Sequence, residues 1–152
     1  IKVNVLSEDK AWSKKLKKKE FFFNSICKFF PKRFQFINKK VYFTLLLSNN
    51  KNIKKLNKKF RNKNKHTDIL SFPFKDKKKK LKEIYLGDLI ISYNYMSKPK
   101  NLSNYEFKKK TIKIFIHGFL HLLGYDHIKN KEYKEMLKEE QKVFKSVEKL
   151  LN

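Results

Sequence analysis

The chain has 152 residues, of which 40% are hydrophobic and 15% aromatic, so it can form one domain with a packed core and is not a wholly disordered chain. The chain has only three glycines and three prolines, and this low number argues against collagen-like, linker-like and turn-rich all-β proteins. A run of eighteen apolar residues is absent, the first residues lack a signal-peptide pattern, and Cys27 has no second cysteine to pair with. We therefore expect a cytoplasmic protein without a membrane span or a disulfide.

Basic residues outnumber acidic residues by 39 to 14, which gives a formal net charge of +25. Such a chain attracts polyanions, of which nucleic acid is the first candidate and an anionic membrane surface the second. Arg33 and Arg61 are the only arginines, and the abundant lysine, asparagine, isoleucine and phenylalanine residues share AT-rich codons. A drift in base composition therefore competes with selection for binding as the origin of the lysines.

The first thirty residues predict a strand followed by one helix. Residues 2–6 read as a short strand. Residues 7–30 carry apolar side chains at helical spacing, with Ser7 as the N-terminal cap and Pro31 as the residue that stops the helix.

The central part of the chain predicts three further strands. Residues 41–47 are β-branched, aromatic and apolar, as in a buried strand, and residues 50–62 have the spacing of a second helix. Two more strands are expected at residues 67–74 and 84–92. The segment between them, residues 75–83, is almost entirely charged and is expected to be a solvated loop.

The last third of the chain predicts two helices. Ser103 and Glu106 fit a capping box, and the helix that follows is apolar nearly all round as far as Leu123, which indicates a central, buried helix. Gly124 is the expected C-terminal stop, and residues 131–151 form an ordinary amphipathic helix. Strands interleaved with helices indicate one layered α+β or α/β domain over residues 1–152.

Three of the four histidines fall within one short segment, as His117, His121 and His127. Residues four apart on a helix lie on the same face, and a turn at Gly124 can bring His127 back toward the first two. Three imidazoles leave the fourth corner of a zinc tetrahedron to water, whose pKa the metal lowers to about 7. Two unpaired imidazoles in an apolar helix would each cost about 1–3 kcal/mol, so metal binding is favoured over a purely structural role.

The spacing His-x3-His-x2-Gly-x2-His is that of the metzincin zinc peptidases. Those enzymes carry a general-base glutamate after the first histidine, where this chain has Gly118. The site is therefore expected to belong to a zinc hydrolase other than a standard protease, and Gly118 is expected to let a bulky substrate approach the helix.

The segment His117-Gly118-x-Leu120-His121-Leu122-x-Gly124-Tyr125-Asp126-His127 resembles the signature of the YbeY family of bacterial metal-dependent endoribonucleases and rRNA maturation factors. Two further segments of this family are similar, in the same order, to Leu56-Asn57-x-x-Phe60-Arg61 with Thr67-Asp68-Ile69-Leu70-Ser71-Phe72-Pro73, and to Leu86-Gly87-Asp88-Leu89-Ile90-Ile91-Ser92. His66 and Phe60 depart from the usual proline and tyrosine. The resemblance covers roughly residues 40 to 145 and leaves the first forty residues unmatched.

The resemblance implies a single α+β domain with a mixed four-stranded sheet packed with helices, and one Zn²⁺ per chain on the metzincin-like helix, held by His117, His121 and His127. It implies cleavage of single-stranded RNA, maturation of the 3′ end of the 16S rRNA of the small ribosomal subunit, and a part in ribosome quality control. Neither DNA nor a membrane is an expected partner. Arg61 matches the functionally important arginine of the family.

The residues themselves give Arg61 an independent argument. A guanidinium grips phosphate through two parallel hydrogen bonds, whereas an ammonium acts as a point charge. An arginine kept in a lysine-rich chain therefore suggests a catalytic phosphate contact, helped by Lys58, Lys59 and Lys63, although Arg33 is a second arginine without such a motif.

Several smaller hypotheses accompany the metal site. Asp126 is expected to cap the turn after Gly124 rather than to orient a ligand, and Cys27 is expected to be inert core. Two other functions remain open, namely a metallohydrolase acting on peptides and a non-catalytic ribosome assembly factor with a structural metal.

Overall fold

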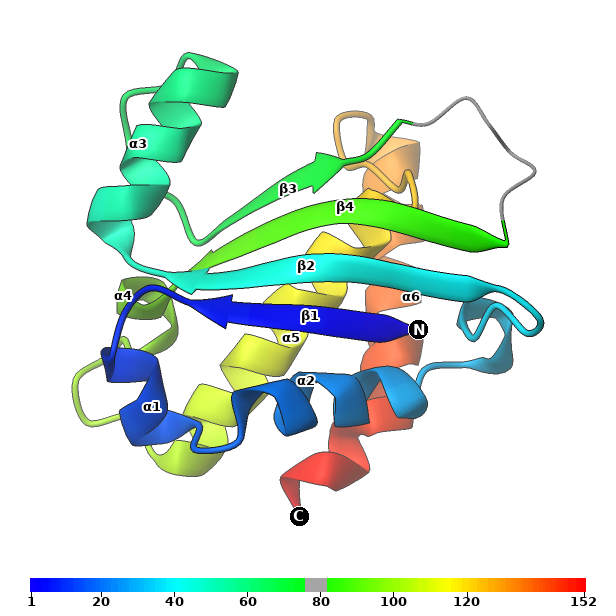
Figure 1. The fold of residues 1–152 in the computed structure, drawn as a ribbon, viewed down its shortest axis with the longest axis horizontal. Coiled ribbons are helices and arrows are strands. Elements are labelled where there is room, and N and C mark those ends of the chain that lie inside the picture. The colour runs from blue at the N-terminus through cyan, green and yellow to red at the C-terminus, as the bar shows by residue number, and fades with distance from the viewer. Residues whose placement is uncertain (76–81) are drawn as a thin grey trace.

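Alternating apolar residues build one mixed β-sheet in this computed structural model, which describes residues 1–75 and 82–152. The strand order is β1-β2-β4-β3 (Figure 1). The strands are β1 (Lys2–Ser7), β2 (Lys40–Ser48), β3 (Ile69–Pro73) and β4 (Glu83–Ser92). β1, β2 and β4 are parallel and β3 is antiparallel to β4, so the expected mixed four-stranded sheet of an α+β domain is confirmed.

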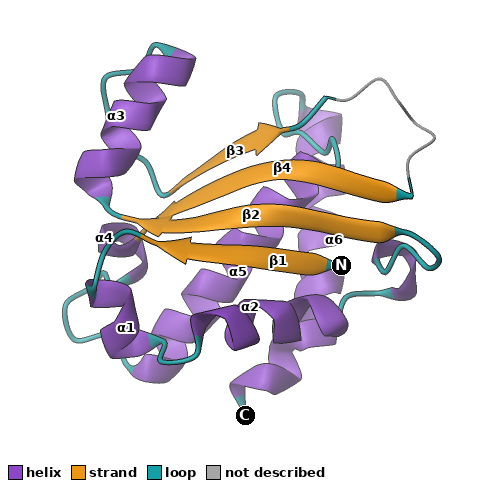
Figure 2. Ribbon diagram, viewed as in Figure 1, coloured by secondary structure: helices purple, strands orange, loops and turns teal. Residues whose placement is uncertain are grey.

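Helices cover one face of this sheet almost completely (Figures 1 and 2). The helices are α1 (Ala11–Lys15), α2 (Lys19–Lys28), α3 (Asn50–Arg61), α4 (Tyr93–Met96), α5 (Asn104–Leu122) and α6 (Asn130–Val147), with 3-10 turns η1 (Lys32–Phe34) and η2 (Glu148–Leu151). In Figure 1, α5 and α6 lie behind the sheet and α2 runs below β1. Every second residue of β2 faces them and is buried, namely Val41, Phe43, Leu45 and Leu47.

α5 lies at the centre of the core, as its apolar circumference predicts. Its buried side chains include Phe107, Phe115 and Phe119, and the rings of Phe115 and Phe119 each lie 5.7 Å from the ring of Phe43 on β2. α3 lies on the other face, where Ile53 packs against Leu70 and Ile90. The central helix is thus fixed on the sheet by large aromatic contacts, which makes it a rigid support for the histidines near its end.

The prediction of one helix over residues 7–30 is wrong, because two helices with a break between them occupy this segment. Ser7 belongs to β1, and the carboxylate of Asp9 accepts the hydrogen bond from the backbone N–H of Ala11 at 2.8 Å. Leu16, at the break, has extended backbone angles (φ −128°, ψ 97°) and a buried side chain. Trp12 on α1 and Phe23 on α2 lie on either side of this break, and both are fully buried in one core.

The other predicted elements are present with small shifts of their ends. The Oγ of Ser103 accepts the backbone N–H of Glu106 at 3.1 Å, which confirms the N-terminus of α5. The last helix ends at Val147 and continues as η2, and α4 was not predicted. The charged loop expected at residues 75–83 falls largely on residues 76–81, which lie outside the described part of the chain. Among the described helices, none is both long and apolar enough to cross a bilayer.

Candidate metal centre

His117 and His121 lie one turn apart near the C-terminal end of α5, and both are half-buried. Their ring centroids are 4.6 Å apart. Both side chains line one cavity together with residues of β3. The spacing predicted from the sequence therefore brings the two imidazoles together.

A Schellman turn brings the third histidine to the first two. Gly124 has a φ of +100°, its N–H donates to the carbonyl of His121 at 3.0 Å, and the N–H of Tyr125 donates to the carbonyl of Leu120 at 3.0 Å. The chain then turns back, and the ring of His127 lies 5.0 Å from that of His121. Gly124 thus ends the helix as predicted and sets the path of the following residues.

The hydrogen bonds of His117 and His121 determine which ring nitrogen of each carries the proton and which carries a lone pair. The Nδ1–H of His117 donates to Oε1 of Glu140 on α6 at 2.6 Å, and the Nδ1–H of His121 donates to the carbonyl of Tyr125 at 2.9 Å. The two Nε2 atoms lie 3.1 Å apart and face each other. With both Nδ1 protons engaged, these Nε2 atoms carry lone pairs that repel at this distance unless a cation lies near both of them.

Burial favours the metal-binding form of His121. Partial burial, reinforced by the charge of His117, lowers the pKa of His121 below its ordinary value, although the hydrogen bond to Tyr125 opposes this shift. The neutral imidazole is the form that ligates a metal. The local environment therefore favours the neutral form of His121, the form that a metal ligand requires.

The three histidines form a compact donor set. One nitrogen of each lies within 4.8 Å of the others, and no further His, Cys, Asp or Glu of the described residues joins them. Three imidazole nitrogens are a donor set typical of zinc and neighbouring transition metals. The residues present therefore fit a metal ion that keeps one coordination position for water or substrate.

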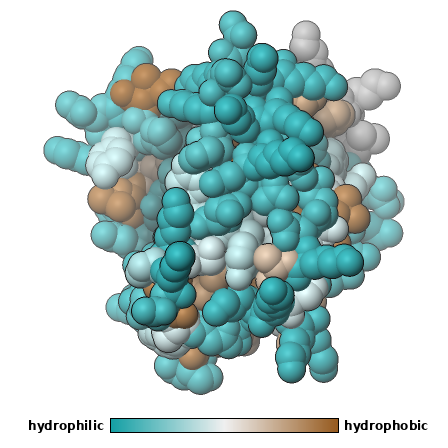
Figure 3. Space-filling view, turned by 90° about the vertical axis from the view of Figure 1, so that its left-hand side faces the viewer, coloured by the Kyte–Doolittle hydropathy of each residue, from teal (hydrophilic) through white to brown (hydrophobic). Residues whose placement is uncertain are grey.

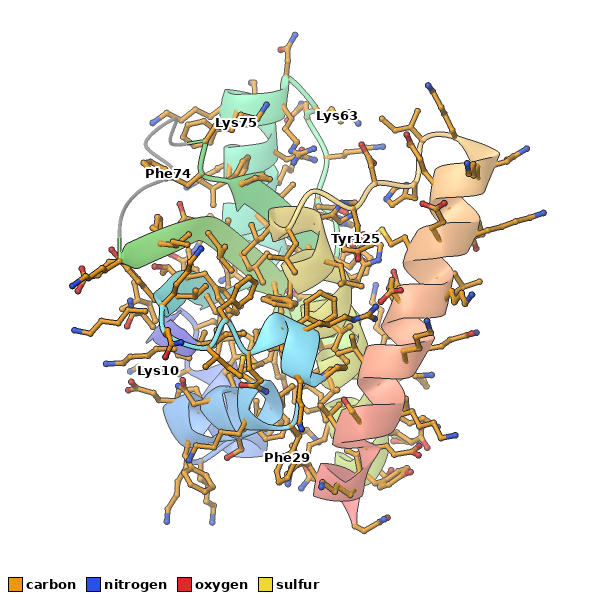
Figure 4. The ribbon with its side chains drawn as sticks, turned by 90° about the vertical axis from the view of Figure 1, so that its right-hand side faces the viewer. Lys10, Phe29, Lys63, Phe74, Lys75 and Tyr125 are labelled. Atoms are coloured by element: carbon orange, nitrogen blue, oxygen red, sulfur yellow. The ribbon has the colours of Figure 1, made fainter. Side chains whose placement is uncertain are left out.

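The cluster opens into a cavity of about 760 Å³. The opposite wall comes from the end of α3, the loop after it and β3, and the basic residues on it are Arg61, Lys63, Lys65 and Lys75. In Figure 4, Lys63 and Lys75 lie at the top of the molecule, above Tyr125. The structure thus places basic side chains across from the histidines, in a cavity large enough for a nucleotide-sized anion.

Arg61 is the last residue of α3 and borders this cavity together with the histidines. Its Nη2 donates to the carbonyl of Ser71 at 2.7 Å, and its guanidinium lies 5.4 Å from the centre of the Phe72 ring. These contacts fix the orientation of the guanidinium group and leave its other N–H groups free to bind an anion. Of the lysines expected beside Arg61, Lys63 lines the cavity, whereas Lys58 and Lys59 do not.

The role predicted for Gly118 is wrong. A Cβ at this position would lie 2.5 Å from Cδ1 of Ile69 and 2.9 Å from Cδ2 of Leu89, so Gly118 faces the sheet and not open space. The missing side chain lets α5 pack closely on β3 and β4. Substrate approach is therefore not the reason for glycine here.

Two of the smaller predictions agree with the structure. The carboxylate of Asp126 accepts the backbone N–H of His127 at 2.7 Å, as expected of a residue that stabilises the turn. Burial raises the pKa of the Cys27 thiol to about 12, which keeps it protonated and consistent with inert core.

Two residues of the site were missed from the sequence. Glu140 lies in the last predicted helix, whose sequence pattern indicates only an amphipathic helix packed on the core. The packing of α6 on α5 brings Glu140 to His117. Asn57 is buried, and its Nδ2 donates to the carbonyl of Lys65 at 2.9 Å, which ties the basic loop to α3. Asn57 could have been found from the sequence, because it is a polar residue on the face of the second predicted helix that is expected to be buried.

Comparison with known proteins gives one consistent family. The family model described as Endoribonuclease YbeY matches residues 4–148. Endoribonuclease YbeY of Pelagibacter ubique is 63% identical over 147 residues, which cover 97% of this chain and 96% of the relative. Endoribonuclease YbeY of Persephonella marina is 36% identical over 108 residues, which cover 70% of this chain and 71% of the relative. A solution structure from Thermotoga maritima matches with a TM-score of 0.58 and 28% identity, over 95% of this chain and 88% of the other.

Proposed function

Because the chain belongs to the YbeY family of endoribonucleases, we propose that it is a metal-dependent endoribonuclease that cleaves single-stranded RNA. One Zn²⁺ per chain would be held by His117, His121 and His127 on a metzincin-like helix, and Arg61 would contact the phosphate that is cleaved. The whole of residues 1–152 would form this one endoribonuclease domain.

The observation that carries the proposal is the facing pair of Nε2 atoms, 3.1 Å apart, beside a basic cavity. Glu140 and the carbonyl of Tyr125 each accept a hydrogen bond from the Nδ1–H of one ring, which leaves the two Nε2 atoms facing each other. Imidazole ligands with a vacant position are typical of catalytic zinc, whereas structural zinc has a fourth protein ligand.

The residues around the cavity would have different roles in the cleavage of a phosphodiester. Lys63, Lys65 and Lys75 attract the RNA backbone, and Arg61 binds two phosphate oxygens and neutralises the charge that develops as the bond breaks. A bound divalent ion supplies Lewis acidity at the phosphoryl group. Glu140 holds His117 in place, and Asn57 holds the backbone of the lysine-bearing loop.

The proposal extends to a substrate and a compartment. We expect single-stranded segments of ribosomal RNA, in particular the 3′ end of the 16S rRNA of the small subunit, with a role in ribosome quality control. The expected compartment is the cytoplasm, where ribosomes are assembled. The test of this substrate is 16S 3′-end maturation in cells that carry Arg61→Ala in place of the wild-type protein, with abundance of the variant measured alongside.

The first experiment measures metal content and RNA cleavage in the same preparations. Wild-type protein should bind one equivalent of zinc and cleave single-stranded RNA, and His121→Ala should lose both. Arg61→Ala should keep the metal and lose most of the cleavage. Equal cleavage by wild type and Arg61→Ala, at equal metal content, would contradict the role of Arg61.

A peptide substrate assay separates the nuclease from a peptidase. We expect no zinc-dependent hydrolysis of casein, because the general-base position of the peptidases is Gly118, packed against Ile69 and Leu89. Robust casein cleavage that His121→Ala abolishes would overturn the nuclease proposal.

A further inference from the structure

A second cavity, of about 450 Å³, lies at the opposite end of α5 from the histidines. Its basic residues, which together define the lysine pocket, are Lys14, Lys15, Lys17, Lys18 and Lys108. They come from the end of α1, the break before α2 and the first turns of α5. Figure 1 shows these segments together at the bottom of the molecule, with the end of α5 that carries the histidines at the top.

The pocket lies at the break between α1 and α2. Leu16 is buried and its backbone is extended, so the chain turns there while its basic neighbours remain at the surface. The lysines on both sides of Leu16 lie beside the first turns of α5, where Lys108 is the fifth basic residue. The exposed ring of Phe21, 69% accessible, lies beside them.

The positive charge of the lysine pocket is not neutralised within the described chain. No acidic residue lines the cavity, and the ion pairs of the described residues involve none of its five lysines. By contrast, Arg33 pairs with Glu139, and Lys40 pairs with Glu83 at 3.5 Å. The face that includes α1, α3 and α4 is hydrophilic over most of its area (Figure 3). Concentrated, unpaired cations in a concave surface form a strong site for a polyanion.

The distance between the two sites follows from α5 itself. Lys108 and His121 are thirteen residues apart on one helix, which corresponds to about 20 Å along its axis at 1.5 Å per residue. A polyanion bound at both sites must therefore be a chain of several phosphates rather than a single small anion. An extended RNA strand meets this requirement, and its bases can stack on an exposed aromatic ring such as Phe21.

We propose that the lysine pocket is a second binding site for the phosphate backbone of RNA, which anchors the substrate about 20 Å from the cleavage site. This inference rests on the proposed nuclease function, because it assigns a second contact to the same substrate. The pocket does not touch the reacting phosphodiester, so its contribution is to affinity.

The test replaces Lys14, Lys17 and Lys18 together by glutamine and uses the full chain loaded with zinc. The control variant replaces Lys134, Lys138 and Lys145, which are exposed on α6, so both variants lose three charges. Affinity for a long single-stranded RNA and for a trinucleotide is measured at several salt concentrations, and cleavage of the long RNA is measured as kcat and KM.

The pocket variant should bind the long RNA ten- to a hundredfold more weakly near 0.1 M salt. Its slope of log affinity against log salt should be shallower by about 2, because each lost phosphate contact removes about 0.7 from the slope of a single strand. Its KM should rise while kcat and trinucleotide affinity stay at wild-type values. The α6 variant should change the slope by much less.

Three outcomes would overturn the inference, and each differs from a failure of the proposed function. If the pocket and α6 variants weaken RNA binding equally, only net charge matters. If kcat falls with KM unchanged, the pocket is not an anchor. The partner is a membrane surface if wild type but not the pocket variant sediments with phosphatidylserine vesicles, while both proteins bind RNA equally. A wild-type protein that cleaves no RNA would instead refute the proposed function itself.

Discussion

The imidazole of His117 connects two helices, because its Nδ1–H donates to Glu140 on α6 while its Nε2 faces His121 on α5. A carboxylate behind a ligand imidazole fixes the ring and raises its basicity. We therefore expect the proposed metal site to depend on Glu140, which would donate no ligand atom.

Replacement of Glu140 by glutamine should lower zinc affinity by about 10- to 100-fold, because the ring of His117 loses its charged partner. Competition with a chromophoric chelator measures this affinity. The control is Glu148→Gln, which replaces an exposed glutamate at the start of η2 and should bind zinc as wild type does. Unchanged affinity in Glu140→Gln would show that the hydrogen bond does not support the site.

Arg61 differs from the surrounding lysines in geometry and not in charge. Arg61→Lys keeps the positive charge but loses the two parallel hydrogen bonds to phosphate, so kcat/KM for RNA should fall by at least about tenfold, the effect of about 1.5 kcal/mol for a charged hydrogen bond. Zinc content should not change, because none of its hydrogen bonds involves the histidines. The control is Arg33→Lys, which changes the other arginine. Full activity in Arg61→Lys would show that Arg61 contributes only its positive charge.

At the scale of elements, the turn after α5 decides whether the third histidine reaches the first two. Gly124 has a φ of +100°, and a Cβ there would have no atom within 4 Å, so an alanine would be penalised by its backbone alone. Gly124→Ala should destabilise the fold by about 1–2 kcal/mol and weaken zinc binding, because relaxation of the turn displaces His127. Urea denaturation and zinc titration measure the two effects. Wild-type values in both would mean that the turn does not control the site.

The central elements could be predicted from the sequence because local patterns determine them. The apolar circumference of α5, the cap at Ser103 and the glycine at its end define a buried helix, and the spacing of His117 and His121 then places both imidazoles on one face. These features depend on residues within a few positions of one another. The family resemblance added the mixed character of the sheet, which no local pattern contains.

The elements that were wrong or missed depend on contacts between distant residues. The segments on either side of the break at Leu16 are held by distant residues, since the Nε1–H of Trp12 donates to the carbonyl of Ser48 at 2.9 Å and the ring of Phe23 lies 5.0 Å from that of Phe115. Glu140 reaches His117 across 23 positions in sequence, through the packing of two helices. Gly118 was assigned to substrate because the side chains that fill its surroundings, from Ile69 and Leu89, come from other elements.

At the scale of the whole molecule, the net charge of +25 is either a binding device or a consequence of base composition. Two separate groups of cations, in the cavity beside the histidines and in the lysine pocket, favour the first explanation. Affinity for single-stranded RNA should therefore fall steeply with salt, with a slope of about −0.7 for each phosphate contacted, and seven or so contacts would give a slope near −5. A flat salt dependence would assign the lysines to composition alone.

In the proposed metal centre, three imidazole nitrogens share one ion and leave a coordination position open. A crystal structure of the zinc-loaded protein, with the ion located by anomalous scattering, tests this most directly. We predict zinc at about 2.0–2.1 Å from Nε2 of His117, Nε2 of His121 and one nitrogen of His127, with a non-protein fourth ligand. Rings that point away from a common centre, or a side chain in the fourth position, would contradict the account.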